Sequence, residues 1–357
     1  MKKLLLIILT LVMLAGCGTD AVVDSDPPVT KEPTLAPTIE PTMEPTEEPV
    51  ATEPAMVESG PISKLNGLPL ENEGDDDNSR IFAVMFDNAA QARWQAGLKE
   101  ASVVYEIRVE GQYTRYVGIF QTNNQDLVLG AVRSARPYFA QTVAEYDAIF
   151  AHHGGSEAGI DKIKELGIDN VDGMFYDGSV YKRQSHKKAP HNSYTSIGAL
   201  NKKADDLKYK TSNNFGGFKF FEEPTAIGGT SAKSVEILYG SNTTEYFYDE
   251  TTVKYERHKD GKLHLDENNS EPLEVSNIII QYVDVKLHEN KTHKVLSNVG
   301  SGTGLLISHG EMVEIQWSKQ SESAQTQFTT KEGETITLNP GQTWIQWIEK
   351  SRTINIE

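Results

Sequence analysis

The chain of 357 residues contains a single cysteine, Cys17, and this scarcity limits how its fold can be stabilised. One cysteine cannot form an intramolecular disulfide, so the folded part must be held together by its hydrophobic core alone. The chain is long enough for such a core, because about 300 residues remain once an N-terminal leader and tether are set aside. That length suggests two domains.

Long hydrophobic runs and positive charge are also scarce. The N-terminal apolar run begins at Leu4 and ends at Leu14, which is shorter than the roughly 20 residues that a membrane-spanning helix needs. No second run is long enough to cross a membrane. The sequence has 34 Lys and Arg against 51 Asp and Glu, a formal net charge of -17. This balance argues against a general nucleic-acid binder, so no nucleic-acid partner is expected.

The short N-terminal run has the features of a bacterial lipoprotein leader. Lys2 and Lys3 precede it, and residues 14–17 read Leu-Ala-Gly-Cys, which is the lipobox pattern. In that motif the cysteine thiol is diacylated and the peptide bond before it is cut. The sequence therefore predicts a signal peptide over residues 1–17 and a mature protein anchored in the lipid bilayer through acyl chains such as palmitate on Cys17. We expect it at the extracytoplasmic face of the cell membrane.

Residues 18–60 form a segment that cannot bury a core. Thr, Glu and Pro dominate it, and a proline recurs at every fourth position from Pro33 to Pro49. Such a composition favours extended conformations of about 3 Å per residue, and its negative charges extend it further. We interpret the segment as a tether that holds the folded part on the order of 100 Å from the membrane. A linker whose length is not selected is the alternative.

Residues 61–230 are predicted to form an N-terminal domain of the layered α/β type. Short apolar runs at 81–86, 102–107, 115–120 and 148–151 predict buried strands. Helical patterns lie at 89–98, 138–146 and 159–166. Strands that alternate with short helices are typical of a sheet covered by helices.

Residues 231–357 are predicted to form an all-β, mostly antiparallel domain. Short stretches of alternating polarity recur there, and Asp260-Gly261, His309-Gly310 and Glu332-Gly333 are hairpin signals. Trp317, Trp344 and Trp347 are expected to fill its core or its edges. The fold class predicted for the whole chain is α+β.

The first candidate ligand residues follow the first predicted strand. Asp87 and Asn88 place a carboxylate and an amide at the end of a strand, a position that suits a ligand or a cation. The same two residues are equally typical of a strand-ending turn.

A second candidate lies ahead of a predicted helix, where Arg133, Ser134 and Arg136 precede Pro137. Two guanidinium groups near a helix N-terminus favour an anionic ligand such as a phosphate or a carboxylate. The structural alternative is that these arginines pair internally with acidic side chains, for which the sequence offers Glu106, Glu110 and Asp147.

Two further loops contribute candidate residues. His153, Gly154 and Gly155 follow another predicted strand, and paired glycines allow the backbone to approach a ligand closely. His191 and Asn192 follow a proline, although the polar run from Asn192 also suits the cap of the next helix. No metal site is predicted, since the histidines lack zinc-site spacing, and no G-x-S-x-G motif indicates a nucleophilic serine.

Several segments resemble the YerB-like lipoproteins, an envelope family of two domains without an established activity. The matching segments of the first domain are 66–69, 83–88, 104–106, 132–139, 153–156 and 189–192. Those of the second domain are 317–319 and 339–345. The resemblance covers the chain from about Asn66 to its end, so only the leader and the tether lie outside it.

A more distant similarity is to the LytR-CpsA-Psr phosphotransferases, which transfer anionic glycopolymers from a polyprenyl pyrophosphate carrier. That resemblance implies a divalent cation at Asp87, with Arg93, Arg133 and Arg136 binding pyrophosphate. It rests on the order of strands, aspartate, arginines and glycine pair, and thus on analogy at the level of the fold.

Two functions follow as hypotheses. The first is a non-catalytic module, without a cofactor, that binds an anionic wall-related ligand or an envelope protein active in wall synthesis. The second is a phosphotransferase on a polyprenyl-pyrophosphate-linked glycopolymer, which would need a divalent cation. The sequence favours binding, because it contains no recognisable spacing of acid, base and nucleophile.

Overall fold

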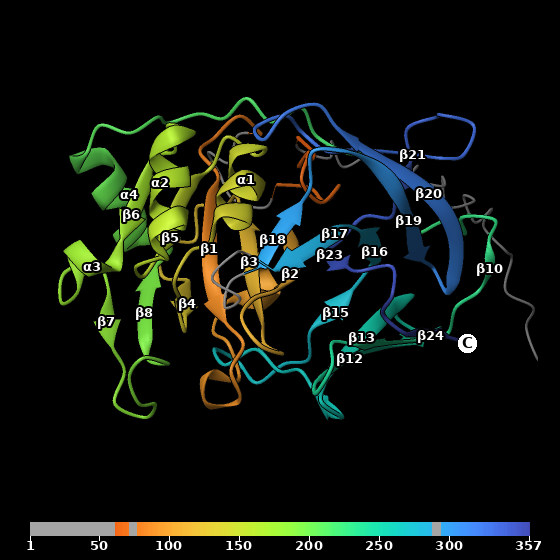
Figure 1. The fold of residues 1–357 in the computed structure, drawn as a ribbon, viewed down its shortest axis with the longest axis horizontal. Helices are drawn as coiled ribbons and strands as arrows, with labels where there is room; N and C mark the ends of the chain where they lie inside the picture. Colours follow the sequence, from red (N-terminus) through yellow and green to blue (C-terminus); the bar gives the residue numbers. More distant parts are fainter. Residues whose placement is uncertain (1–60, 71–76, 288–293) are drawn as a thin grey trace, which may run out of the picture. The chain divides into compact units, whose positions relative to one another are not determined.

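One sheet of eleven strands runs through the part of the chain that the computed structural model describes, residues 61–70, 77–287 and 294–357 (Figure 1). Its strands are arranged in the order β10-β20-β19-β16-β23-β2-β3-β1-β5-β6, and β21 pairs with β20. The predicted leader, Cys17 and the tether lie outside the described residues.

Strands from both predicted domains contribute to this sheet. Those before residue 230 are β1 (Phe82–Asp87), β2 (Val103–Arg108), β3 (Thr114–Phe120), β5 (Ile149–His152) and β6 (Asn170–Asp172). Those from residue 230 onward are β10 (Thr230–Ser231), β16 (Asn277–Tyr282), β19 (Gly300–Ser308), β20 (Glu311–Lys319), β21 (Gln327–Thr329) and β23 (Thr343–Ile348). The two sets meet where β2 pairs in parallel with β23, with Val103 opposite Thr343 and Ile107 opposite Trp347.

A second sheet of six strands is antiparallel throughout and belongs to the C-terminal part. It comprises β11 (Ser234–Leu238), β12 (Thr243–Asp249), β13 (Lys254–Lys259), β14 (Lys262–Leu263), β15 (Glu274–Val275) and β24 (Ile354–Ile356). Small sheets join β4 (Val128–Gly130), β7 (Lys182–Arg183) and β8 (Ser193–Ser196), β9 (Lys219–Phe220) and β22 (Thr337–Leu338), and β17 (Asp284–Leu287) and β18 (Lys294–Ser297). The α+β fold, with a mixed sheet in the first part and mostly antiparallel strands in the second, is therefore confirmed.

The α-helices all lie in the first part of the described chain. They are α1 (Pro137–Ala144), α2 (Glu157–Glu165), α3 (Gly173–Tyr176) and α4 (Ile197–Asp206). Pro137 stands in the first turn of α1, where the missing amide hydrogen costs nothing. Ser156 and Ser196 cap α2 and α4, each accepting a hydrogen bond from an amide in the first turn. Within the described ranges, no helix has the length and apolar content that crossing a membrane requires.

The helix predicted over residues 89–98 is wrong. The structure has two short 3-10 turns there, Ala90–Ala92 and Leu98–Glu100, with extended backbone between them. The side chain of Gln95, which is fully buried, donates from Nε2 to the carbonyl oxygen of Asp87 at 2.8 Å. Trp94 stacks on His264, with ring centroids 4.8 Å apart. These contacts with the rest of the molecule replace the local hydrogen bonds of a helix.

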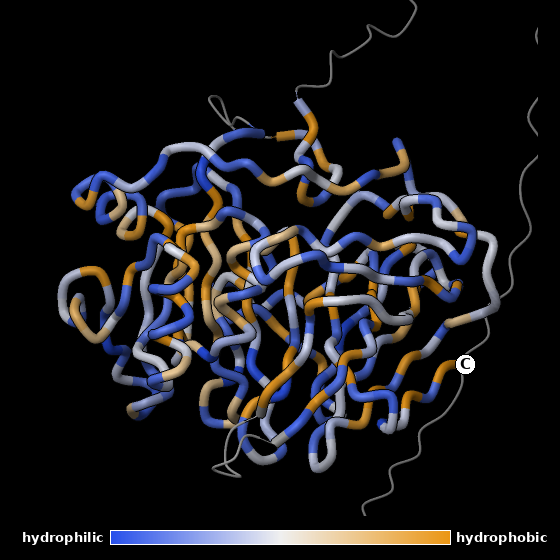
Figure 2. The backbone as a smooth tube through the Cα atoms, turned by 45° about the horizontal axis from the view of Figure 1, so that its top comes forward, coloured by the Kyte–Doolittle hydropathy of each residue, from blue (hydrophilic) through white to orange (hydrophobic). Residues whose placement is uncertain are grey.

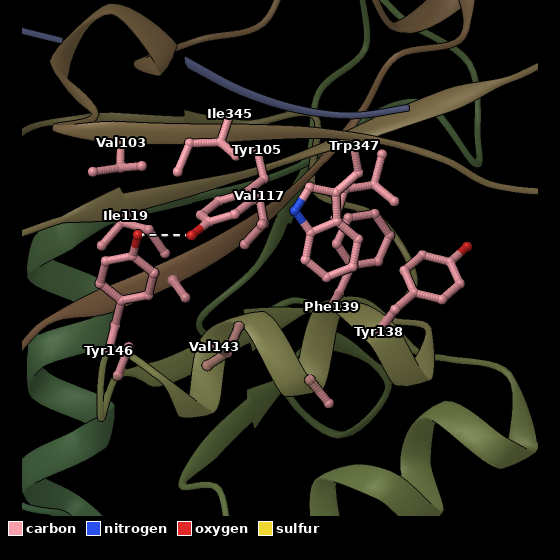
Figure 3. Close-up of a cluster of buried hydrophobic side chains, with 14 of the residues drawn as sticks. Val103, Tyr105, Val117, Ile119, Tyr138, Phe139, Val143, Tyr146, Ile345 and Trp347 are labelled. Carbon is pink, nitrogen blue, oxygen red and sulfur yellow. Dashed lines mark hydrogen bonds between the residues drawn. The ribbon is translucent and has the colours of Figure 1, made fainter. Parts of the chain in front are cut away.

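Two hydrophobic cores lie on opposite faces of the large sheet, and apolar residues follow its strands through the molecule (Figure 2). On one face α1 packs its Phe139 and Val143 against Tyr105 and Trp347, and the hydroxyl groups of Tyr105 and Tyr146 lie 2.9 Å apart (Figure 3). The other face packs against the six-stranded sheet. As expected, Trp317, Trp344 and Trp347 are buried.

Because side chains alternate along β2, the carboxylate of Glu106 lies between the large sheet and the six-stranded sheet. Tyr105 faces the α1 core, so Glu106, its neighbour, faces the six-stranded sheet. Glu106 lies 2.6 Å from Nη2 of Arg257 and 3.1 Å from Nζ of Lys259, and all three side chains are fully buried. The two cations come from β13, so this triad links the two parts of the chain.

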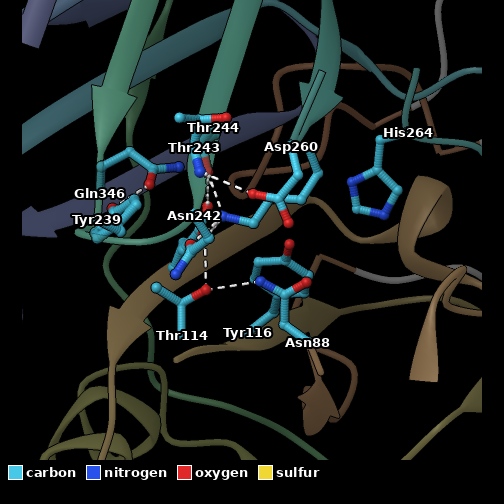
Figure 4. Close-up of polar contacts among 12 residues, drawn as sticks. Asn88, Thr114, Tyr116, Tyr239, Asn242, Thr243, Thr244, Asp260, His264 and Gln346 are labelled. Atoms are coloured by element: carbon cyan, nitrogen blue, oxygen red, sulfur yellow. Dashed lines mark hydrogen bonds and ion pairs between the residues drawn. The ribbon is translucent and has the colours of Figure 1, made fainter. Parts of the chain in front are cut away.

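Hydrogen bonds complete the surroundings of Glu106. Thr114 donates to its Oε1 at 2.7 Å and Thr244 donates to its Oε2 at 3.0 Å. Figure 4 shows the two groups of side chains that meet here, with Asn88, Thr114 and Tyr116 facing Asn242 and Thr244. Burial alone raises the pKa of Glu106, but the charges of Lys259 and Arg257 outweigh it and bring the pKa down to about 2. The carboxylate is therefore ionised at neutral pH.

A second buried ion pair also joins the two parts. Glu145, directly after α1, lies 3.0 Å from Nζ of Lys319 at the end of β20, and both side chains are buried. The amide and the hydroxyl of Thr326 donate to the same carboxylate oxygen, at 2.8 Å and 2.7 Å. Two acidic side chains of the first part thus bind cations of the second part.

We predict that Glu106→Gln lowers the free energy of unfolding by about 3–5 kcal/mol, because it leaves two buried cations without a counter-ion. Lys259→Met should cost less, since Glu106 keeps Arg257. Urea denaturation of the chain from residue 18 onward measures both. The control is Asp205→Asn, which breaks the pair with Arg80 at a carboxylate that is 66% exposed and should cost less than about 1 kcal/mol. Equal losses for Glu106→Gln and the control would contradict the assignment.

Candidate functional site

Polar side chains gather at one edge of the large sheet. Asp87 ends β1, His152 ends β5 and Asp172 ends β6, and these three strands are parallel neighbours. Parallel strands bring their carboxyl ends to the same edge, and the residues that follow them therefore lie close together. Two loops complete this edge, residues 131–136 after β4 and residues 184–192 between β7 and β8.

Asp87 lies at the centre of a small cluster. Its Oδ2 is 3.1 Å from Nε of Arg133 and 2.7 Å from Nδ1 of His191, and its Oδ1 accepts a hydrogen bond from the amide of Ala89 at 3.0 Å. Asp87 is buried, so these partners replace its hydration. The structure thus brings together three residues that the sequence singled out, Asp87, Arg133 and His191. No described residue hydrogen-bonds to Nε2 of His191, which leaves that nitrogen available to a ligand.

A cleft of about 310 Å³ lies beside this cluster, and we name it the arginine cleft. Its lining includes Asp87, Glu110, Tyr113, Arg115, Arg133 and His191. Arg115 lies near the start of β3, opposite Asp87 in the antiparallel register. Its Nη1 donates to the carbonyl oxygen of Ser134 at 2.6 Å.

Arg115 differs from every other arginine in the described part of the chain. Each of the others forms an ion pair with a carboxylate, whereas Arg115 forms none. Yet Arg115 is only 8% exposed. Burial, together with repulsion from Arg136 and Arg133, lowers the pKa of Arg115 to about 10. A buried guanidinium without its own counter-ion is unfavourable, and an anion in the cleft would stabilise it.

A second hollow, of about 500 Å³, adjoins the first, and we name it the aromatic hollow. Its lining includes Arg133, Ser134, His153, Gly154, Phe175 and Arg183. Arg133 lines both spaces. Predicted site residues from the loops after β4 and β5 therefore meet here, as Ser134, His153, Gly154 and Gly155 all line this hollow.

Hydrogen bonds fix His153 in its neutral form. Nη2 of Arg183 lies 2.8 Å from Nε2 of His153, and because a guanidinium can only donate, this nitrogen must accept. Nδ1 then carries the proton and donates to Oγ of Ser193 at 2.8 Å. Burial lowers the pKa of His153, and the charge of Arg183 lowers it further. His153 therefore supplies no positive charge to the hollow at neutral pH.

Three predicted ligand residues lie outside both hollows. Arg136 binds Glu110 through two hydrogen bonds of 2.5 Å and 2.9 Å, which is the internal pairing that the sequence left open. Asn88 donates to Oγ1 of Thr114 at 2.6 Å, and Asn192 donates to the carbonyl oxygen of Gln184 at 3.0 Å. None of the three lines either hollow, and their role as ligand residues stays a prediction. They hold the loops and strands that carry the site.

Each arginine of the distant phosphotransferase resemblance is paired with a carboxylate of the protein itself. Arg93 pairs with Asp260 at 2.5 Å, Arg133 with Asp87, and Arg136 with Glu110. Each guanidinium is thus held by a separate carboxylate. Asp87, to which the resemblance assigns a cation, already contacts Arg133 and His191. No group of three or more His, Cys, Asp or Glu side chains in residues 61–70, 77–287 and 294–357 is arranged to hold a metal ion.

Other lining residues were not singled out in the sequence as ligand-binding. Arg115 belongs to a strand pattern, and only the register of β1 with β3 reveals that it lies opposite Asp87. Phe175 lies in a segment without a motif and belongs to α3, whereas Arg183 belongs to a basic segment of the sequence and ends β7, and both line the aromatic hollow with Arg133. A basic residue at a strand end was the only sequence signal for Arg115.

Comparison with protein families matches both parts of the chain. Residues 65–210 match the model described as protein of unknown function (DUF3048) N-terminal domain, and residues 235–345 match the corresponding C-terminal domain. The protein named "Putative lipoprotein YerB" of Bacillus subtilis (strain 168) is 32% identical over 285 residues, which are 79% of this chain and 84% of that protein.

A solved structure is also similar. The crystal structure of the YerB protein from Bacillus subtilis matches with a TM-score of 0.74 at 31% identity, and the match covers 82% of this chain and 99% of that one. The resemblance to YerB-like proteins that the sequence motifs indicated is therefore confirmed.

We predict that Gly173→Ala displaces His153, because a β-carbon on Gly173 would lie 2.3 Å from Nδ1 of that imidazole. The hydrogen bond from His153 to Ser193 should be lost, at a cost of about 1–2 kcal/mol in unfolding free energy. Urea denaturation gives the free energy, and the imidazole resonances of His153 in NMR spectra report the displacement. An unchanged His153 resonance would contradict the prediction. Met174→Ala, at a neighbouring residue that is 66% exposed, is the control and should leave stability unchanged.

Proposed function

The chain belongs to the DUF3048 family, and from this membership and the geometry of the site we propose that it is a lipid-anchored extracytoplasmic protein whose arginine cleft binds an anionic group of a cell-envelope component. The proposal has two parts, the anchor and the cleft. Each has its own support and its own experiment.

The anchor is supported by the leader sequence and by a relative. Lys2, Lys3, the apolar run and the Leu-Ala-Gly-Cys segment are the features of lipoprotein processing. The similar protein of Bacillus subtilis carries lipoprotein in its name. With two or three acyl chains on Cys17, each buried methylene contributes about 0.8 kcal/mol, which suffices for lasting attachment.

Anion binding is supported above all by Arg115. This buried guanidinium lacks an ion pair, although its cleft also contains Asp87 and Glu110. Arg133 neutralises Asp87 and Arg136 neutralises Glu110, which leaves the charge of Arg115 in excess. In a chain with a net charge of -17, such a local positive excess favours an anion as the occupant.

The donors suit a phosphate or carboxylate group. Arg115 and Arg133 present planar guanidinium groups that donate hydrogen bonds to such an anion. A phosphate or carboxylate of a wall polymer is therefore the ligand that we propose, and an acidic side chain of an envelope protein would present the same group. The protein then acts by binding, and none of the proposed contacts requires a chemical step.

We expect Cys17→Ser to abolish lipid attachment, because serine lacks the thiol that is acylated. Metabolic labelling with a palmitate analogue and mass spectrometry of the mature N-terminus measure this directly. The variant should shift from the membrane fraction to the soluble extracytoplasmic fraction. A bare thiol at position 17 in the wild-type protein would contradict the anchor.

We expect Arg115→Met to weaken binding of inorganic phosphate at least tenfold, because it removes the charge in excess. The variant should change the free energy of unfolding by less than about 1 kcal/mol, since the lost hydrogen bond to Ser134 is offset by relief of a buried charge. Isothermal titration calorimetry at fixed ionic strength and urea denaturation provide the two readouts.

The matched control is Arg352→Met, which removes an arginine that pairs with Glu349, outside the arginine cleft. It should leave phosphate binding unchanged. Wild-type protein that binds neither phosphate nor a glycerol phosphate polymer would refute the cleft as an anion site.

A further inference from the structure

The two hollows share Arg133 in their linings, and they differ in chemistry. Charged side chains set the character of the arginine cleft, which Ala89, Val109 and Tyr113 also line, whereas the aromatic hollow combines Ile160, Met174, Phe175 and Pro190 with polar groups. If the anion of a ligand lies between Arg115 and Arg133, the rest of the ligand can extend either within the arginine cleft or past Arg133 into the aromatic hollow. On the side of the aromatic hollow it meets both apolar and hydrogen-bonding surface.

Phe175 and Met174 are unusually exposed for apolar side chains. Phe175 is 80% exposed and Met174 is 66% exposed, and both belong to α3, a single turn held at the edge of the sheet. Asp172 fixes that turn, since its Oδ1 accepts from the amides of Gly154 and Met174 at 2.7 Å and 2.9 Å. The two apolar side chains are thus presented by an ordered element, beside a hollow that contains Arg133.

Polar groups in the same hollow argue against a purely apolar occupant. Arg183, Ser134 and the backbone around Gly154 line it together with Phe175. An alkyl or isoprenoid chain would cover these groups without hydrogen-bonding to them, which is unfavourable. A pyranose ring has an apolar face of C–H groups and hydroxyl groups around its edge, so it can stack on an aromatic ring and still satisfy its polar neighbours.

We propose that the aromatic hollow binds the sugar ring of a glycosyl phosphate whose phosphate lies in the arginine cleft. This inference rests on the proposed function, because the phosphate position is the anion site described above. A tetrahedral phosphate suits the cleft better than a planar carboxylate, since Arg115 in β3 and Arg133 in the loop after β4 approach from separate elements and can contact oxygens that point in different directions. Phe175 then determines the preference for a ring next to the anion.

The experiment compares three probes by calorimetry with the chain from residue 18 onward: inorganic phosphate, N-acetylglucosamine 1-phosphate and hexyl phosphate. We expect the sugar phosphate to bind about tenfold more tightly than phosphate, and hexyl phosphate to gain little. Phe175→Ala should remove that gain and leave the affinity for inorganic phosphate unchanged. Because Phe175 is exposed, thermal unfolding of the variant should match that of the wild type.

Phe247→Ala is the matched control, since Phe247 is 45% exposed and lies on β12, outside both hollows. It should bind all three probes like the wild type. If phosphate binds but the sugar adds nothing, or if Phe175→Ala keeps the gain, the sugar subsite is refuted while the anion site stands. A gain for hexyl phosphate instead of the sugar also refutes it. If no probe binds, the proposed function itself fails.

Discussion

The ion pairs of the Glu106 carboxylate fix how the N-terminal and C-terminal parts of the described chain are joined. The carboxylate lies between the large sheet and the six-stranded sheet, where it binds Arg257 and Lys259, and all three side chains are shielded from water. Charges in such a position are tolerated only when every one is paired and hydrogen-bonded, so the two sheets have little freedom to shift. Arg257 also lies 3.9 Å from the ring of Trp344, and this contact joins the triad to the core of β23. The hydrophobic effect holds the sheets together, and the triad fixes how they meet.

The candidate site is connected to this triad through two hydrogen bonds. Thr114 donates to Glu106, and Asn88 donates to Thr114. Asn88 directly follows Asp87, which contacts Arg133 and His191 in the arginine cleft. The position of Asp87 is therefore set from two directions, by the end of β1 and by the buried polar network. Asn88 thus links the end of β1 to the buried polar network, and its role as a ligand residue stays a prediction.

Pairing of charges explains why the arginine cleft stands out in an acidic protein. In the part of the chain that the structure describes, the other arginines, from Arg80 to Arg352, have a carboxylate partner, and only Arg115 is left with neighbouring charges but no ion pair. Arg115 is thus the exception among the described arginines, and in the proposed function an anion from outside takes the place of the missing carboxylate. Phe175 is the apolar counterpart of this exception, since it is an aromatic side chain that the core does not cover.

The sequence by itself determined the class of the fold, the strands β1, β2, β3 and β5 of the large sheet, the predominance of strands in the second part, and the kinship with YerB-like proteins. These depend on local patterns, because the period of apolar residues and the positions of Gly, Pro and Ser specify strands, turns and caps without distant contacts.

Only the tertiary structure decided which charges meet. Sequence offered Glu106 as one partner for Arg133 or Arg136, but the parallel pairing of β2 with β23 and the packing of the second sheet gave it Arg257 and Lys259 instead. Likewise, Arg115 faces Asp87 because of a strand register, and residues 89–98 are not helical because Gln95 and Trp94 both contact the distant His264. Ion pairs and registers join residues far apart in the chain, and no local pattern encodes them.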